Sequence, residues 1–335
     1  MRYTRLAIIV TFFLSIYKLS FAQCDKDLNM YQHHSIELEN DTIRYHTYSK
    51  QSFDSLTTIL LYIQGSKAYS LYQAKRENGK LWIGTTVPIK LKSIPENYLF
   101  VLISKKDIPF CTVLDEDIPI SELYYKNQTL GYRTFQVDQV VNDLMRKHKN
   151  HFKKIIALGH SEGSDVVAKL GTINTDITHF GYWSGGGYTQ FLDFVTFIRK
   201  KVDTKQLSEE EAQAKIDTLF YDLKDIMANP NAIDKFWKGK NNSYNRWSHF
   251  CEPPIDNLLK INKPIFVAIG TKDRSVPIES AYLIPIEFIR HKKDNLTFKA
   301  YPNLDHGFGK EIVKGKFEEH FNDVFDDFLK WVNKE

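Results

Sequence analysis

Predominantly apolar runs alternate with stretches of helically spaced apolar positions along this 335-residue chain. Such runs, with little polar interruption, are typical of strands that are covered on both faces of a sheet. We predict strands of this kind at residues 57–63, 98–104, 155–158 and 264–270, with two more at 177–183 and 295–301. Apolar positions three or four residues apart predict helices over 134–149, 278–290 and 317–331. The alternation predicts an α/β fold built on a mostly parallel, doubly wound sheet.

The chain before the first apolar run has a different pattern. Apolar and polar residues alternate over 35–39 and again over 42–48, on either side of the turn-forming pair Asn40-Asp41. We therefore expect a β-hairpin at the start of the fold. Residues 67–96 give no clear pattern, and residues 105–130 are expected to form a long irregular loop.

Residues 188–262 contain helical signals and no strand pattern. Ser208-Glu209-Glu210-Glu211 is a capping box that opens a helix running to about Ala228. We interpret the segment as a helical cap inserted into an α/β core formed by residues 23–187 and 263–335; the alternative is that these helices simply flank the sheet. Four aromatic residues in the segment either form the core of the cap or line an acyl or aromatic pocket: Phe236, Trp237, Trp247 and Phe250.

The first 22 residues have the pattern of a secretory signal peptide. Arg2 and Arg5 precede an apolar run at 6–16, and Ser20 and Ala22 are small residues suited to cleavage before Gln23. The apolar run is short for a bilayer span. We expect a secreted or periplasmic protein with no stable membrane span after cleavage; an uncleaved membrane anchor is the alternative.

Composition narrows the possible functions. The net charge of +4 is small for this length, and no long basic run occurs, so nucleic acid is not an expected partner. An exported chain with Cys24, Cys111 and Cys251 can form one disulfide, and the sequence leaves the pairing open. The cysteine spacing does not match a metal site, and we expect neither a metal nor a cofactor.

A candidate nucleophile lies between a predicted strand and a predicted helix. Residues 159–163 read Gly-His-Ser-Glu-Gly, with Ser161 at the centre. A G-x-S-x-G pattern at a strand-to-helix turn is typical of a nucleophile elbow, in which flanking glycines let the two elements approach closely. A plain tight turn with a surface serine is the alternative.

A serine nucleophile needs a base and an orienting acid, and in a parallel sheet both should follow strands. Of the eleven histidines, only His306 lies in a glycine-bearing loop after a predicted strand. Asp273 follows the 264–270 strand, whereas the loop after Trp183 has no carboxylate before Asp193. We predict His306 as general base and Asp273 as orienting acid, and we expect the neighbouring Asp305 to shape the turn.

An oxyanion hole requires two N–H donors near the nucleophile. The residue after the nucleophile, Glu162, is predicted to supply one backbone N–H. The loop after the 57–63 strand is predicted to supply the other, from Ser66 or from Gly65.

These motifs resemble those of the α/β-hydrolases over about residues 35–334. The Gly-His-Ser-Glu-Gly-Ser elbow is similar to that of bacterial carboxylesterases and of dienelactone-hydrolase or prolyl-oligopeptidase-like members, and Asp-Arg-Ser-Val-Pro at 273–277 resembles the acid loop. The resemblance implies a triad of Ser161, Asp273 and His306, in that chain order. The sequence Gln-Gly-Ser at 64–66 departs from the His-Gly-Gly-Gly of some lipases and esterases.

The leading hypothesis is a secreted or periplasmic serine hydrolase that cleaves a carboxylic ester through an acyl-enzyme. Its substrate is expected to be a small-molecule ester or a short peptide. Two alternatives stay open at this point: a serine peptidase of the prolyl-oligopeptidase-like type, and a non-catalytic binding protein on the same scaffold.

Overall fold

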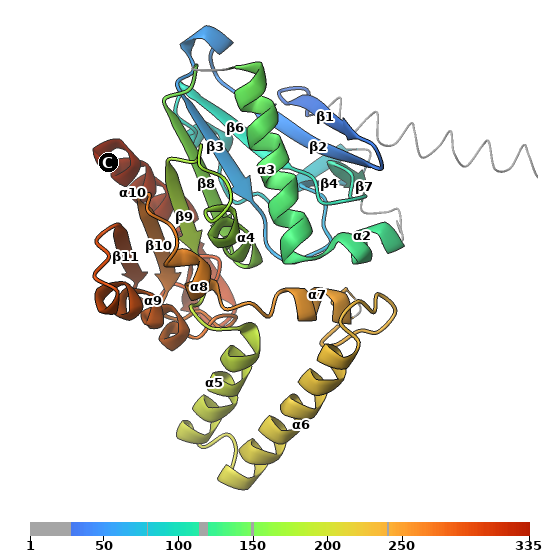
Figure 1. The fold of residues 1–335 in the computed structure, drawn as a ribbon, viewed down its shortest axis with the longest axis vertical. Coiled ribbons are helices and arrows are strands. Elements are labelled where there is room, and N and C mark those ends of the chain that lie inside the picture. Colours follow the sequence, from blue (N-terminus) through green and yellow to red (C-terminus); the bar gives the residue numbers. More distant parts are fainter. Residues whose placement is uncertain (1–27, 79, 114–119, 149–150, 240) are drawn as a thin grey trace, which may run out of the picture.

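An eight-stranded sheet forms the centre of the computed structural model, which describes residues 28–78, 80–113, 120–148, 151–239 and 241–335 (Figure 1). The strand order is β1-β2-β6-β3-β8-β9-β10-β11. Strands β1 and β2 form the predicted antiparallel hairpin, β2 pairs antiparallel with β6, and every later neighbour is parallel. The predicted α/β fold with a mostly parallel sheet is therefore confirmed. The strands are β1 Gln32–Leu38, β2 Asp41–Tyr48, β3 Thr58–Ile63, β6 Tyr98–Ile103, β8 Lys154–His160, β9 His179–Trp183, β10 Ile265–Gly270 and β11 Leu296–Tyr301.

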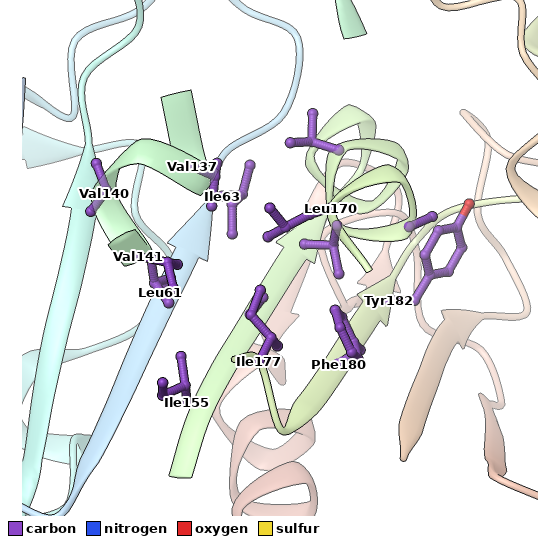
Figure 2. Packing of buried hydrophobic residues seen from close by; sticks show 14 of the residues in the cluster. Leu61, Ile63, Val137, Val140, Val141, Ile155, Leu170, Ile177, Phe180 and Tyr182 are labelled. Carbon is purple, nitrogen blue, oxygen red and sulfur yellow. The ribbon is translucent and has the colours of Figure 1, made fainter. Parts of the chain in front are cut away.

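Helices cover both faces of this sheet. Helices α3 (Leu130–Lys147), α4 (Glu162–Leu170), α8 (Pro254–Leu258) and α9 (Ile278–Arg290) pack on one face, where the buried cluster in Figure 2 lies. Helix α10 (Phe321–Lys334) packs on the other face. Every residue of β3 is buried, as expected for a strand with a layer on each side.

Two polar stretches contain structure that the sequence pattern did not indicate. Residues 67–96 include the antiparallel pair β4 (Tyr72–Glu77) and β5 (Lys80–Thr85). The expected irregular loop at 105–130 was wrong in part, because it contains β7 (Cys111–Val113), which pairs with β4, and α2 (Glu122–Asn127). Two short 3-10 helices, Phe53–Ser55 and Leu91–Ser93, join strands.

The last predicted helix begins later than expected. A hairpin of β12 (Gly309–Val313) and β13 (Lys316–Glu319) follows the His306 loop, and α10 begins only at Phe321. All four residues of β13 are exposed, so its apolar Phe317 belongs to a surface hairpin and not to the apolar face of the helix.

The segment predicted as a cap is helical. Helices α5 (Gln190–Asp203) and α6 (Glu209–Ala228) extend away from the sheet in Figure 1, and α7 (Tyr244–His249) lies between them and α3. Both hydrogen bonds of the predicted capping box are present at Ser208. Helix α8 lies in the range predicted for the cap, yet Ile255 and Leu258 pack in the main core. The domain boundaries themselves stay a prediction.

The cysteines and the leader can be placed only in part. Cys111 is disulfide-bonded and Cys251 is free. Cys24 and the predicted signal peptide, residues 1–22, lie outside the described residues. Within the described ranges, no helix is both long enough and apolar enough to cross a bilayer.

Candidate active site

Ser161 lies at the apex of a sharp turn between β8 and α4. Its backbone has φ 59° and ψ −131°, in a region that side-chain-bearing residues rarely adopt. The flanking glycines are sterically required: a Cβ on Gly159 would lie 2.1 Å from the Gly163 oxygen, and one on Gly163 would lie 2.1 Å from the Ile63 oxygen. The geometry is that of a nucleophile elbow, because strand and helix can approach only without these side chains.

His306 and Asp273 meet at the carboxyl end of the sheet. Nδ1 of His306 is 2.8 Å from Oδ2 of Asp273. The other carboxylate oxygen, Oδ1, accepts the backbone N–H groups of Ser275 at 2.7 Å and Val276 at 2.9 Å. Every side-chain atom of Asp273 is buried, whereas His306 is a quarter exposed. The carboxylate therefore has a fixed orientation, and it in turn orients the imidazole.

The backbone of the His306 loop is fixed as well. The carbonyl of His306 accepts a hydrogen bond from Nε2 of His160 at 2.8 Å and another from the Ser184 hydroxyl at 2.9 Å. Burial lowers the pKa of His160 to about 4, so its ring is neutral and Nε2 carries the donated proton. Asp305 Oδ1 accepts from the N–H groups of Gly307 and Gly309, which fits the predicted turn-shaping role.

Ser161 and His306 line one cavity of about 1390 Å³ together with the predicted oxyanion residues Gly65, Ser66 and Glu162. A Cβ on Gly65 would lie 3.2 Å from the Ser161 Cβ and 3.5 Å from its Oγ, so the loop after β3 passes directly beside the serine. Glu162 is the first residue of α4, and its N–H therefore has no acceptor within the helix. The structure thus brings all the predicted site residues together, with Asp273 behind His306.

Aromatic side chains from the predicted cap line the far part of the cavity. Phe194 and Phe197 of α5 lie there with Trp247 and Phe250. Trp247 also packs in the cluster formed by the cap helices, so it lies both in the core of the cap and in the lining of the cavity. Phe236 is 41% exposed and lies outside the cavity lining. The sequence pattern did not single out Phe194 or Phe197, because helical spacing alone cannot tell a pocket face from a core face.

Two carboxyl groups also line the cavity, Asp193, which is buried, and Asp165, which is partly buried. Burial raises the pKa of Asp165 and of Asp193 to about 7 in each case. The Tyr182 hydroxyl lies 3.2 Å from Oδ1 of Asp165, whereas Oδ1 of Asp193 has no hydrogen-bond partner in the described part of the chain. Neither residue contacts His306 in the way Asp273 does, so neither replaces it as the orienting acid.

A family model and several solved structures match parts of this chain. Residues 237–335 match the Dienelactone hydrolase family, a range that contains both Asp273 and His306. Ser161 lies outside the matched range. No curated protein sequence matches the chain.

Solved structures match over most of the chain at low sequence identity. Est1E from Butyrivibrio proteoclasticus is 14% identical with a TM-score of 0.52, covering 90% of this chain and 98% of that one. The dienelactone hydrolase-like structure from Klebsiella pneumoniae subsp. pneumoniae MGH 78578 is 12% identical with a TM-score of 0.52, covering 91% and 98%. Pyrococcus horikoshii acylaminoacyl peptidase is 10% identical with a TM-score of 0.56, covering 93% of this chain and 43% of that one. The chain has the α/β-hydrolase fold, and the matches support a hydrolase.

Proposed function

We propose that the protein is an exported serine hydrolase that cleaves carboxylic esters through an acyl-enzyme on Ser161. One observation carries the proposal: the strained Ser161 shares a cavity with His306, whose Nδ1 is held 2.8 Å from a buried Asp273 carboxylate. A serine forced into this backbone conformation, beside an oriented imidazole, is the arrangement that nucleophilic catalysis needs.

The reaction follows in two halves. Nε2 of His306 takes the Ser161 proton as Oγ attacks the ester carbonyl, and the tetrahedral oxyanion accepts the N–H of Glu162 and an N–H of the 64–66 loop. Collapse breaks the bond from the acyl carbon to the alcohol oxygen, and His306 returns the proton to the leaving alcohol. Water, deprotonated by His306, then attacks the acyl-enzyme; its collapse releases the carboxylic acid and restores Ser161.

The test uses the purified protein, p-nitrophenyl esters of increasing acyl length, and a fluorophosphonate probe. We expect turnover of short and medium esters and a covalent adduct on the peptide that contains Ser161. Ser161→Ala should lose both the adduct and turnover, by at least ~10³-fold, while keeping the wild-type melting temperature. Full activity in Ser161→Ala, or no adduct on the wild type, would contradict the proposal.

Two other functions give different results in the same assay. The structural likeness to an acylaminoacyl peptidase makes aminoacyl amides the comparison substrates. Activity on amides alone would identify a peptidase, and the absence of both turnover and adduct would favour a non-catalytic binding protein. Ester cleavage faster than amide cleavage supports the esterase.

Export is a separate part of the proposal, and it rests on the sequence of residues 1–22. Expression of the full chain in a host with a secretory pathway should give a mature protein that begins at Gln23. Mass spectrometry of the N-terminal peptide checks this, and retention of Met1 with the membrane fraction would favour an anchor.

A further inference from the structure

The loop after β3, residues 64–67, turns four consecutive carbonyl oxygens toward side chains that are largely buried. The Gln64 carbonyl accepts from Arg133, those of Gly65 and Lys67 accept from Lys105, and that of Ser66 accepts from Tyr124 and Gln128. A loop held in this way has little freedom to rotate its peptide planes. We call residues 64–67 the oxyanion loop.

Holding a carbonyl also orients the next N–H. In a trans peptide the C=O of one residue and the N–H of the following residue point in opposite directions. Lys105, by holding the Gly65 carbonyl, therefore sets the direction of the Ser66 N–H. Arg133, by holding the Gln64 carbonyl, sets that of the Gly65 N–H in the same manner. These two N–H groups are the candidates for the second oxyanion donor.

Lys105 is an unusual residue in this position. It directly follows Ser104 at the end of β6, and it is only 5% exposed. A buried lysine is normally paired with a carboxylate, yet no described carboxylate lies within ion-pair distance of this one. Its ammonium group instead bonds the carbonyls of Gly65 and Lys67 at 2.5 and 2.6 Å. Burial, followed by the charge of Arg133, lowers the pKa of Lys105 well below its ordinary value. The buried amino group of Lys105 therefore binds the loop carbonyls instead of a described carboxylate.

A buried ion-pair chain reaches the same loop from the cap. Arg246 of α7 donates to Oε2 of Glu162 from Nε at 2.7 Å, with Nη2 at 2.6 Å, and Arg133 of α3 donates to Oε1 at 2.6 Å. All three side chains are at most 6% exposed. Burial alone would raise the pKa of Glu162, but the charges of Arg246 and Arg133 outweigh it and lower that pKa. The ionised Glu162 thus connects the cap to Arg133 and, through it, to the Gln64 carbonyl.

We propose that Lys105 and Arg246 are positioning residues of the oxyanion hole. Lys105 orients the Ser66 N–H directly, and Arg246 makes the loop geometry depend on the seating of the cap, through Glu162 and Arg133. Neither side chain need touch the reacting atoms. This inference rests on the proposed function, because it assigns a role to groups around the same acyl-enzyme chemistry.

Lys105→Met tests the direct contact. The methionine fills a similar volume without an N–H, so the oxyanion loop loses two hydrogen bonds. Loss of one well-aligned oxyanion donor typically lowers kcat by about 10²-fold, and we expect a fall of that order with KM within about threefold of wild type. Lys105→Gln, which keeps an N–H donor on a shorter side chain, should recover part of kcat. Lys106→Met is the matched control, since Lys106 pairs with Asp41 and not with the loop.

A boronic acid that forms a tetrahedral adduct with Ser161 separates positioning from general loosening. Its affinity should fall in Lys105→Met by a factor similar to that of kcat/KM, whereas a neutral ground-state ketone or product alcohol should bind as before. A purely structural lysine would lower the melting temperature and leave the ratio of these two affinities unchanged, which would overturn the inference.

Arg246→Lys tests the coupling to the cap. The lysine keeps the charge beside Glu162 but loses the two-pronged contact, so we expect kcat to fall about tenfold while the melting temperature stays close to wild type. Lys169→Met removes an ion pair between α4 and the cap segment at Glu252 that has no link to the loop, and it should leave kcat unchanged. Equal kcat in Arg246→Lys and wild type would overturn the coupling.

Different results would contradict the proposed function and the positioning role. A wild-type protein without turnover or fluorophosphonate adduct contradicts the proposed function. An active wild type whose kcat and boronate affinity survive in a folded Lys105→Met and Arg246→Lys contradicts the positioning role alone.

Discussion

The two sides of the cavity are held in place by different kinds of contact. On the acid–base side, Asp273 is fixed by two backbone N–H groups of its own loop, and the His306 carbonyl is fixed by His160 and Ser184. On the oxyanion side, the 64–67 loop is fixed mainly by long charged side chains from other elements. One side is assembled from loops at the ends of neighbouring strands, whereas the other depends on α3 and on the cap.

Hydrogen bonds to backbone groups and contacts from buried charged side chains should differ in how much they affect stability. On the acid–base side, the contacts are hydrogen bonds to backbone N–H and carbonyl groups of loops that the strands of the sheet already hold in place. Buried ion pairs carry a desolvation penalty that is offset only if every partner is in place. We therefore expect changes on the acid–base side to affect catalysis with little effect on stability. On the oxyanion side, changes that remove a buried charge should affect both.

Asp273→Asn should have the largest effect on turnover and a small effect on stability. The amide oxygen can still accept the N–H groups of Ser275 and Val276, but an amide cannot stabilise the imidazolium of His306. We expect kcat to fall on the order of 10⁴-fold, with unfolding free energy changed by less than about 1 kcal/mol. Ester kinetics and urea unfolding measure the two quantities, and a large loss of stability would break the comparison.

Arg133→Met should affect both quantities. It leaves Glu162 buried with one partner fewer and releases the Gln64 carbonyl. We expect the free energy of unfolding to fall by about 3–5 kcal/mol, the range for breaking a buried pair. kcat should fall by roughly 10-fold or more as the Gly65 N–H loses its orientation. Wild-type stability in this variant would show that the oxyanion side is not held by charge.

Asp193→Asn tests the effect of a buried charge in the predicted cap. The carboxyl group of Asp193 is buried there, and its Oδ1 has no hydrogen-bond partner in the described part of the chain. Burial raises its pKa from 3.8 to about 7, so the folded protein holds this proton more tightly than the unfolded chain. The contribution of Asp193 to stability should therefore be fully present below pH 4 and should be lost as the pH rises to 7. The variant lacks this loss and should be more stable by on the order of 2 kcal/mol at pH 8, with no gain at pH 4.

Thermal unfolding of both proteins across this pH range measures the difference. Asp193→Asn and wild type with the same pH dependence of stability would mean that Asp193 does not titrate in this range.

Lys169→Met is expected to have the smallest effect. Its ion pair with Glu252 is about one-third exposed on each side chain, and such pairs contribute less than about 1 kcal/mol. Urea unfolding should detect little change and ester kinetics none. A larger fall in the free energy of unfolding would show that ion pairs also hold α4 against the cap at the protein surface.

The acid–base side could be predicted from the sequence because each of its residues lies in the loop that follows a recognisable strand. Strand β10 is a continuous apolar run, and a carboxylate directly after it lies at the carboxyl edge of the sheet by topology alone. The same reasoning placed His306 after β11. Their mutual contact follows from the parallel pairing of β10 with β11, which the alternation of strands and helices already indicates.

The oxyanion side could not be predicted in the same way. The residues that hold it, Lys105, Arg133 and Arg246, are 28 to 141 positions apart, and no spacing rule links them. Lys105 does lie two residues after strand β6, so the strand-end rule applied to lysine would have singled it out. Strand β13 was missed because all four of its residues are exposed, and β5 has exposed apolar side chains, such as Trp82 at 61%. Among the β4 side chains that the structure describes, only Tyr72 and Ala74 are buried, which is too short an alternation to indicate a strand.

The positive φ of Ser161 has a consequence for how this sequence can change over time. Glycine is the residue best suited to that backbone conformation, and it would also remove the nucleophile of the proposed reaction. A lineage released from selection on catalysis would drift toward glycine here and become more stable as it lost activity. Retention of serine at this position in descendants is thus a direct record of continued selection for turnover.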